Sequence, residues 1–229
     1  MTESKTTKKS ILIGGITFSF VILLISLSAT QLYYKTNPYN GNTLFLSRLA
    51  IWFCLLLTYI YSSKVEKQNF LPWKENNYSF LGYIKTFFIL LFMLIPAITL
   101  GSLLVKLSGG NTESLKLDEI VAILSKNIAL LLFFCITAGI TEELLFRGYI
   151  LPRFNVLLKN SYLSIAISSL LFGILHYSYG TFIQVIGPFL LGVVFAIHYN
   201  KYRNIKIIIL CHFLWDLMGM LIKTNYFSH

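Results

Sequence analysis

Seven long apolar segments, separated by short polar connections, dominate the pattern of this 229-residue chain. They are Ile11 to about Ala29, Leu44–Tyr61, about Thr86–Val105, a segment opening at Ile128, Tyr162–Tyr177, Phe182–His198 and Ile207–Ile222. A helix of about 17 to 25 apolar residues is long enough to cross the hydrocarbon core of a bilayer. The pattern therefore predicts an all-α fold, a polytopic membrane helix bundle of about seven transmembrane helices.

Prolines mark where these helices are expected to bend or end. Pro96 and Pro188 lie inside their segments, and a kink there is tolerated in a membrane helix. Pro152 disfavours helical geometry at the residue before it. We therefore expect the fourth helix, which opens at Ile128, to end near Pro152.

Basic residues fall in alternate connections between the apolar segments. They are Lys5, Lys8 and Lys9, then the lysines of residues 64–85, then Arg147 to Lys159, then Lys201, Arg203 and Lys206. Cytoplasmic loops carry such an excess of Lys and Arg, so we expect the N-terminus to be cytoplasmic. The first segment is long for a signal peptide, the alternative, and an uncleaved anchor is favoured. Arg48, near the outer end of the second helix, is expected to snorkel to the interface.

Composition supports the membrane class. The chain is 56% hydrophobic and 12% charged, with a mean hydropathy of +0.70, whereas soluble domains carry about 25% charged residues. The net charge of +10 is distributed between the apolar segments and forms no single patch, so nucleic acid is not an expected partner. Cys54, Cys135 and Cys211 have no metal-ligand spacing and are expected to be buried thiols.

Candidate chemistry begins where the fourth apolar segment meets Glu142, Glu143 and Arg147. Charged residues in a membrane helix cost about 2.5 to 3.5 kcal/mol each and are usually functional. Glu143 and Arg147 are four apart and can pair on one helix face. Glu142 is turned about 100° away and stays available to act on water. Taken alone, the stretch fits equally well two acids that snorkel to water at the helix end.

Two further spans contribute histidines. The fifth ends with Phe172 and His176 on one helix face, and the seventh carries His212 and Asp216 four residues apart. An acid one turn away can orient an imidazole. His176 alone fits an interfacial histidine equally well, whereas His212 and Asp216 lie within an apolar helix.

Hydrolysis needs groups of this kind. A carboxylate and an imidazole can deprotonate water and later protonate a leaving amine, and a second imidazole can stabilise the oxyanion. The sequence has no Gly-x-Ser-x-Gly elbow and no His-Glu-x-x-His motif, which disfavours serine chemistry and the common zinc helix.

The ordered motifs Glu142-Glu143-x-x-x-Arg147, Phe172-x-x-x-His176 and His212-x-x-x-Asp216 resemble those of the CAAX protease and bacteriocin-processing (CPBP, or Abi) family. The resemblance implies a glutamate-dependent intramembrane endopeptidase that needs no cofactor. By position it implies that Glu142 and His176 activate water, while His212 and residue 216 stabilise the oxyanion. The best-understood members have asparagine at that last position, and an ionised Asp216 would repel an oxyanion, so Asp216 is either protonated or orients His212.

The resemblance covers roughly Ile128–Ile222. It divides the chain into a cytoplasmic tail (residues 1–10), three helices with their loops (11–126) and a CPBP-like catalytic core (127–229). Catalytic roles are expected for Glu142, Glu143, His176, His212 and Asp216, and a structural ion-pair role for Arg147. We also expect a water-filled cavity open to the cytoplasmic side, because these charges need solvation.

The expected partners are the lipid bilayer and a hydrophobic or prenylated peptide substrate, and the expected location is the bacterial plasma membrane. A non-catalytic membrane partner or a bacteriocin self-immunity protein is the alternative function. A zinc-dependent hydrolase using His176, His212 and a glutamate as ligands is a further alternative. The sequence leaves the oligomeric state and the substrate open.

Overall fold

The structure is a computed structural model that describes residues 8–223. Within this range the chain is helical, and it contains no β-strand. The α-helices are α1 (Lys9–Tyr34), α2 (Gly41–Tyr61), α3 (Phe80–Leu107), α4 (Leu115–Leu124), α5 (Ile128–Glu143), α6 (Leu151–Leu158), α7 (Ser161–Leu175), α8 (Ile183–Tyr202) and α9 (Ile205–Lys223). Two π-helical segments, η1 (Ser62–Glu66) and η2 (Leu144–Ile150), and one 3₁₀ turn, η3 (His176–Tyr179), complete the described chain.

Seven of the helical stretches in residues 8–223 are long and apolar enough to cross a bilayer. This confirms the predicted all-α bundle of seven spans, and the chain is an integral, multi-pass membrane protein. α4 is the short helix outside this set. It begins after the cap Ser114, whose hydroxyl accepts from the N–H of Leu117, and its residues Ile120 and Leu124 are buried.

The fourth span does not end near Pro152. It runs from Ile128 to Leu158 as one helical stretch, because η2 continues α5 directly into α6. Pro152 lies in the first turn of α6, where its missing N–H is tolerated. The π-helical turn before it is wider than an α-helical turn and can accommodate the proline ring. The predicted end at Pro152 was therefore wrong.

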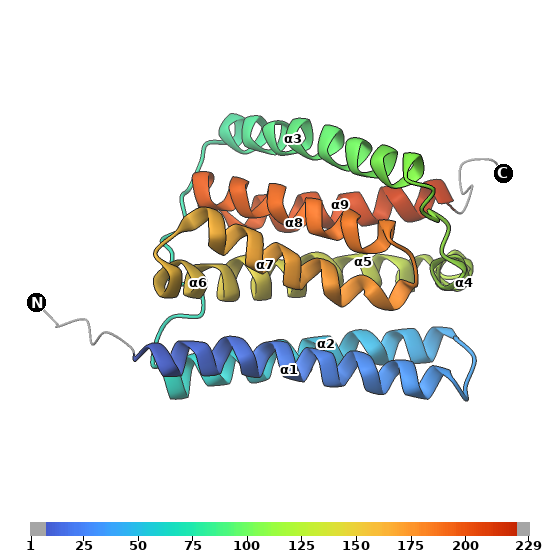
Figure 1. Ribbon diagram of the computed structural model, residues 1–229, viewed down its shortest axis with the longest axis horizontal. Helices are drawn as coiled ribbons and strands as arrows, with labels where there is room; N and C mark the ends of the chain where they lie inside the picture. The colour runs from blue at the N-terminus through green and yellow to red at the C-terminus, as the bar shows by residue number, and fades with distance from the viewer. Residues whose placement is uncertain (1–7, 224–229) are drawn as a thin grey trace, which may run out of the picture.

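The spans lie side by side along the long axis of the molecule (Figure 1). α1 and α2 form an antiparallel hairpin at one edge, and α3 lies at the opposite edge. Between them lie α5 to α9, where α7 packs on α8 and α5 packs on α9. The helices that carry the sequence motifs therefore form the inside of the bundle.

Two glycines allow the inner helices to approach closely. A Cβ at Gly139 would lie 3.0 Å from the backbone oxygen of Ile209 in α9 and 3.1 Å from the backbone nitrogen of Phe213. A Cβ at Gly173 would lie 2.9 Å from the backbone oxygen of Val185 in α8. Small residues at such crossings are typical of membrane helix pairs. Gly139 therefore permits α9 to bring its polar side chains against α5.

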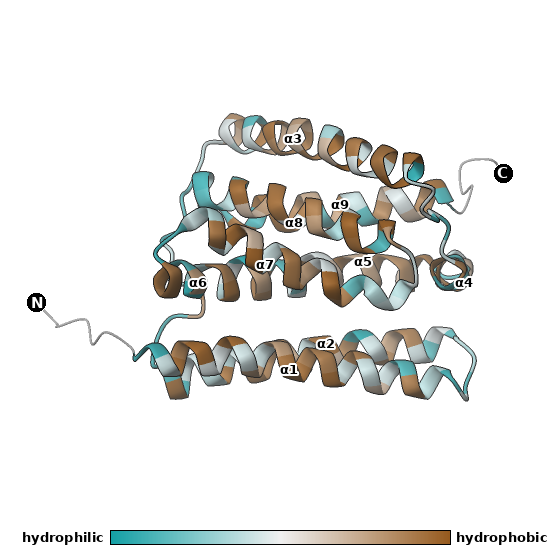
Figure 2. Ribbon diagram, viewed as in Figure 1, coloured by the Kyte–Doolittle hydropathy of each residue, from teal (hydrophilic) through white to brown (hydrophobic). Residues whose placement is uncertain are grey.

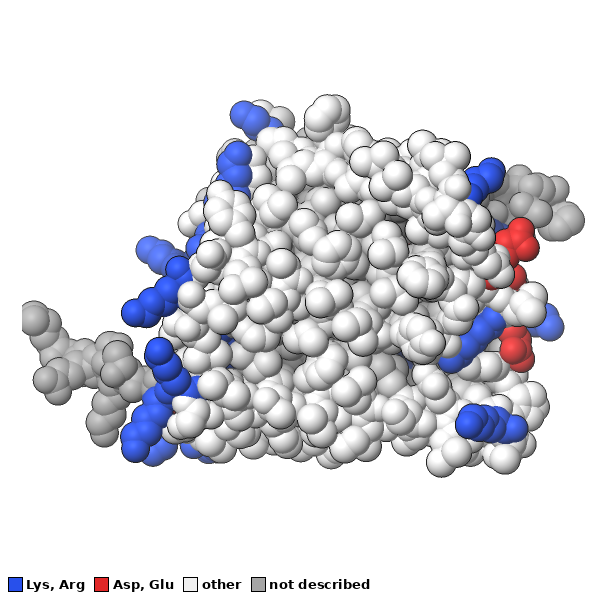
Figure 3. Space-filling model, in the orientation of Figure 1, with Lys and Arg blue, Asp and Glu red and all other residues white. Residues whose placement is uncertain are grey.

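Charge separates the two ends of the molecule, while its sides are apolar (Figures 2 and 3). The end that we call the basic end contains the start of α1, segment η1, α6 and the junction of α8 with α9. The other end, which we call the α4 end, carries the acidic residues of the loop before α4 and of α4 itself, with lysines among them, whereas the basic end shows only basic side chains in this view. This agrees with a cytoplasmic basic end under the positive-inside rule, but the orientation stays a prediction.

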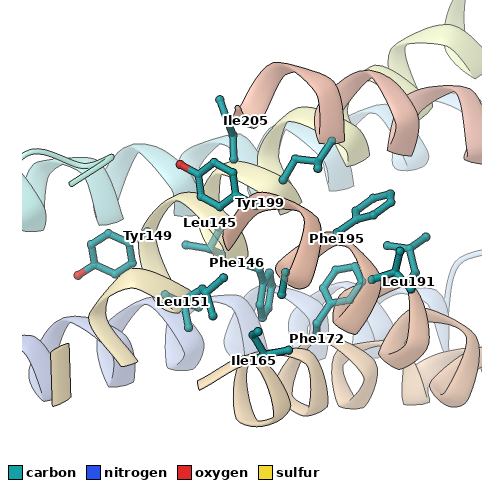
Figure 4. Packing of buried hydrophobic residues seen from close by; sticks show 14 of the residues in the cluster. Leu145, Phe146, Tyr149, Leu151, Ile165, Phe172, Leu191, Phe195, Tyr199 and Ile205 are labelled. Carbon is teal, nitrogen blue, oxygen red and sulfur yellow. The ribbon is translucent and has the colours of Figure 1, made fainter. Parts of the chain in front are cut away.

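The core lies where the inner helices meet (Figure 4). Phe146, Phe172 and Phe195 come from η2, α7 and α8 and are each at most 2% exposed. The three cysteines are free and buried, as expected. This aromatic packing fixes the neighbouring ends of α5 and α7, from which the candidate site is built.

Candidate active site

Glu143 is the centre of a buried network between α5, η2 and α9. Its Oε1 accepts from Nη1 of Arg147 at 2.8 Å and from Nδ1 of His212 at 2.7 Å. The side chain of Glu143 is 0% exposed and that of Arg147 is 2% exposed. Buried ions of this kind are stabilised when they are paired and hydrogen-bonded. Glu143 therefore positions Arg147 and His212.

Arg147 is also held by aromatic rings. Its guanidinium carbon lies 4.6 Å from the ring centre of Phe172 and 5.6 Å from that of Phe195. Such contacts stabilise a desolvated cation. Phe172 therefore serves packing, and it connects the ion pair to His176, whose ring centre lies 4.9 Å from that of Phe172.

The hydrogen bond to Glu143 fixes the tautomer of His212. Because a carboxylate oxygen accepts, Nδ1 of His212 donates, and the ring directs Nε2 away from Glu143. Nε2 lies 3.6 Å from Oδ2 of Asp216 and 3.8 Å from Oε2 of Glu142. Both of these acids keep some exposure, 18% for Glu142 and 26% for Asp216. Nε2 of His212 is therefore placed between the two more accessible carboxylates.

His176 is fixed in a similar way. Its Nδ1 lies 2.9 Å from the backbone oxygen of Phe172, which can only accept, so Nδ1 carries the proton. Nε2 of His176 then has a free lone pair. This nitrogen is available to accept a proton from a water in the adjoining cavity.

Glu142, His176, His212 and Asp216 all line one cavity of about 320 Å³. The cavity also has walls from α3, α4 and α8. It reaches Leu117 in α4 and Lys223 at the end of α9, and none of its lining residues comes from the basic end. The cavity expected on the cytoplasmic side therefore does not lie at the basic end, which the sequence predicts to be cytoplasmic: the motif side chains point into the half of the bundle that faces the α4 end.

The length of the fourth span explains how Glu142 and His176 meet. An end near Pro152 would place Glu142 much closer to the basic end than His176, which follows a 15-residue helix. The span instead continues to Leu158, sixteen residues beyond Glu142, and α7 begins at Ser161. At 1.5 Å per residue, both side chains then lie about 20 to 25 Å from that end.

Arg48 is the residue of this site that sequence reasoning placed elsewhere. It does not snorkel outward: it lines the cavity, and its guanidinium carbon lies 3.7 Å from the ring centre of Phe134 in α5. Its charge interacts with His176, Tyr179 and Asp216. The available signal was a single arginine within the apolar run of α2, and such residues usually face the bundle interior.

A second buried ion pair lies outside the cavity. Nη2 of Arg153 is 2.5 Å from Oε2 of Glu66, and Tyr149 donates to Oε1 of the same carboxylate at 2.7 Å. Arg153 is 2% exposed, so its assignment to a basic loop was wrong. This cluster fastens η1, which follows the α1–α2 hairpin, to the fourth span.

Within residues 8–223, no group of three or more His, Cys, Asp or Glu side chains has a geometry that could hold a metal ion. His212 instead uses Nδ1 for the hydrogen bond to Glu143.

Comparison with known proteins identifies the region that carries these residues. Residues 124–218 match the family model described as Type II CAAX prenyl endopeptidase Rce1-like. No curated protein and no solved structure matches the chain. The matched range contains Glu142, Glu143, Arg147, His176, His212 and Asp216, and it does not include Arg48. The resemblance found in the motifs is thereby confirmed over residues 124–218, the region that is similar to the Rce1-like, CPBP family.

Proposed function

We propose that this protein is an intramembrane endopeptidase of the glutamic type, which hydrolyses a peptide bond in a hydrophobic or prenylated peptide delivered through the membrane. The observation that carries the proposal is the convergence of Glu142, His176 and His212 from three helices on one cavity. Three side chains that each reached water separately at a membrane interface would not line the same cavity. The family match over the same residues supports a peptidase.

Glu142 and His176 act on the attacking water. The Glu142 carboxylate is partly exposed in the cavity, and Nε2 of His176 has a free lone pair beside it. One of them accepts a proton as the water oxygen bonds to the carbonyl carbon of the substrate. The electron pair of the C=O bond moves to the oxygen, which becomes an oxyanion.

His212 stabilises this oxyanion. Three carboxylates surround its ring, and as an imidazolium it can donate Nε2–H to the oxyanion while Nδ1–H stays bound to Glu143. Asp216 faces Nε2 of His212 and is a positioning residue in this scheme, since an ionised carboxylate does not donate. The C–N bond breaks as the oxyanion collapses, and the proton taken from water passes to the leaving amine.

Glu143 and Arg147 have no direct contact with the reaction in this scheme. Glu143 holds the tautomer of His212, and Arg147 balances the charge of Glu143. This assigns positioning to Glu143, where the sequence pattern suggested a catalytic group. The catalytic core is proposed to be residues 127–229, with residues 11–126 supplying additional walls of the cavity.

The proposed location is a bacterial plasma membrane with the N-terminus in the cytoplasm. The cavity, which extends toward the α4 end, would then be reached from the outer side. A cysteine introduced at Glu113 should react with a membrane-impermeant maleimide in intact cells, and one at Lys159 should react only after the cells are opened. The reverse pattern would invert this orientation.

Catalysis is tested with purified protein in proteoliposomes and a set of fluorogenic hydrophobic peptides, with and without a prenyl group. Wild-type protein should cleave members of the set, and Glu142→Gln should lower the rate by about 10²-fold or more. Glu119→Gln, which removes an exposed acid in α4, is the matched control and should keep the wild-type rate. Equal rates for wild type and Glu142→Gln would contradict the proposal and favour a non-catalytic membrane partner. Activity that is lost on chelation and restored by zinc would favour the metal-dependent alternative.

A further inference from the structure

Arg48 brings a positive charge to the cavity from outside the family-matched region. It belongs to α2, whereas the matched residues begin at Leu124. Trp52, one turn later, donates through Nε1 to the hydroxyl of Thr137 at 3.1 Å and joins α2 to α5. Together with the Phe134 ring under the guanidinium, this contact keeps Arg48 turned toward the site.

The guanidinium of Arg48 lacks a strong anionic partner. In the part of the chain that the structure describes, Arg147 and Arg153 are paired with buried glutamates, but Arg48 forms no ion pair. Its Nε is buried and has no hydrogen-bond partner there. Its guanidinium does hydrogen-bond to the hydroxyl of Tyr179, which is neutral. An arginine inside a membrane bundle that has no ion-pair partner usually marks a ligand path.

Three cavities meet at Arg48. It lines the main cavity, a second of about 60 Å³ toward α1 and α4, and a third of about 80 Å³ between the α1–α2 hairpin and the inner helices. The main and the third cavity share Glu142 and His176 as well. A group bound to Arg48 therefore lies beside the residues that act on water.

We propose that Arg48 binds a carboxylate of the substrate and so sets which peptide bond reaches Glu142. A guanidinium presents parallel N–H donors that match the two oxygens of a carboxylate. The carboxylate could belong to the C-terminus of the peptide or to an acidic side chain near the cleaved bond. This inference rests on the proposed endopeptidase function, because it names a feature of the same substrate.

Lys116 strengthens the argument for an anion. This α4 residue lines the second cavity together with Arg48, and its Nζ donates to the backbone oxygen of Ser178 at 3.2 Å. An anionic group that approaches from the α4 end would meet Lys116 first and Arg48 deeper in. The acids Glu142 and Asp216 lie beyond Arg48 on the main cavity and would repel a second negative charge.

The test measures binding, so that it does not depend on turnover. Full-length protein with Glu142→Gln in lipid nanodiscs is titrated with fluorescent hydrophobic peptides in matched pairs. One pair differs in a C-terminal carboxylate or amide, and a second pair, amidated at the C-terminus, differs in an internal Asp or Asn. Arg48→Gln, Arg48→Lys and Lys35→Gln are added to this background, the last as a control that removes an exposed charge at the end of α1.

The acidic member of one pair should bind about ten-fold or more tightly, as expected for a charge-assisted hydrogen bond. Arg48→Gln should reduce that ratio to near one, Arg48→Lys should leave an intermediate ratio, and Lys35→Gln should leave it unchanged. The pair that responds identifies the source of the carboxylate as the chain terminus or a side chain.

A missing preference for the acidic peptide in the starting protein, or a binding ratio that survives Arg48→Gln, would overturn the inference. So would equal weakening of both members of each pair, which would assign Arg48 to balancing the charge of Asp216. If the wild-type protein does not cleave the peptides but the binding ratio depends on Arg48 as expected, the proposed endopeptidase function is rejected and carboxylate binding by Arg48 is retained.

Discussion

Glu143 and His212 are joined by a 2.7 Å hydrogen bond between Oε1 and Nδ1, although 69 positions separate them in the chain. The bond decides the roles of two adjacent glutamates. Glu143 is fully buried and directs the imidazole, while Glu142 is partly exposed in the cavity that the imidazole faces. Neighbouring residues of one type thus acquire different chemistry from their different directions on the helix.

Replacing Glu143 tests this division of roles. Glu143→Gln keeps an oxygen that can accept from His212 but removes the charge that balances Arg147, and its amide can rotate to offer N–H instead. We expect kcat to fall by about 10- to 100-fold, in the range seen for lost partners of functional histidines, with KM little changed. The measurement is steady-state cleavage of a hydrophobic peptide in proteoliposomes. An unchanged kcat would show that His212 needs no charged partner.

The close crossing of α5 and α9 gives a stability prediction. Gly139→Ala would place a methyl group 3.0 Å from the backbone oxygen of Ile209, so α9 must shift, at an expected loss of about 1 to 3 kcal/mol. Gly219→Ala is the matched control on α9, because no atom lies within 4 Å of its added Cβ. The free energy of unfolding, measured by reversible unfolding in mixed micelles, should be well below the wild-type value for Gly139→Ala and close to it for Gly219→Ala. Equal stabilities would contradict the tight crossing.

The buried pair of Arg153 with Glu66 is predicted to be structural. Arg153→Met removes the positive charge beside the buried carboxylate, and the expected loss of stability is roughly 3 to 5 kcal/mol. Adding Glu66→Gln should recover part of that loss, because no buried charge then remains at this place. Thermal unfolding of both variants measures the recovery. A double variant less stable than Arg153→Met would show that Glu66 stabilises the fold by other contacts.

Much of the architecture could be predicted from the sequence. Long uncharged runs have few options in a bilayer, so the seven spans followed from hydropathy alone. Helical spacing of four residues placed Glu143 with Arg147 on one face, and the structure brings His212 and Asp216 within 3.6 Å. These are local relations, which one helix determines without reference to its neighbours.

Relations between distant segments were harder to predict. The π-helical turn of η2 carries the helix through Pro152, and its wider geometry has no simple sequence signal. An end near Pro152 would have placed Glu142 and His176 at different depths in the bundle. Arg48 was placed at the interface because its inward direction depends on Phe134 and Trp52 packing against α5, contacts that periodicity does not reveal.

The central claim is that Glu142 and His176 act on the same water. Single-turnover cleavage of one hydrophobic peptide should be compared for wild type, Glu142→Gln, His176→Gln and the double variant, in identical proteoliposomes. Residues that act as one unit are strongly non-additive, so the double variant should be little slower than the slower single variant. Losses that multiply in the double variant, or a single variant that cleaves at the wild-type rate, would contradict the account.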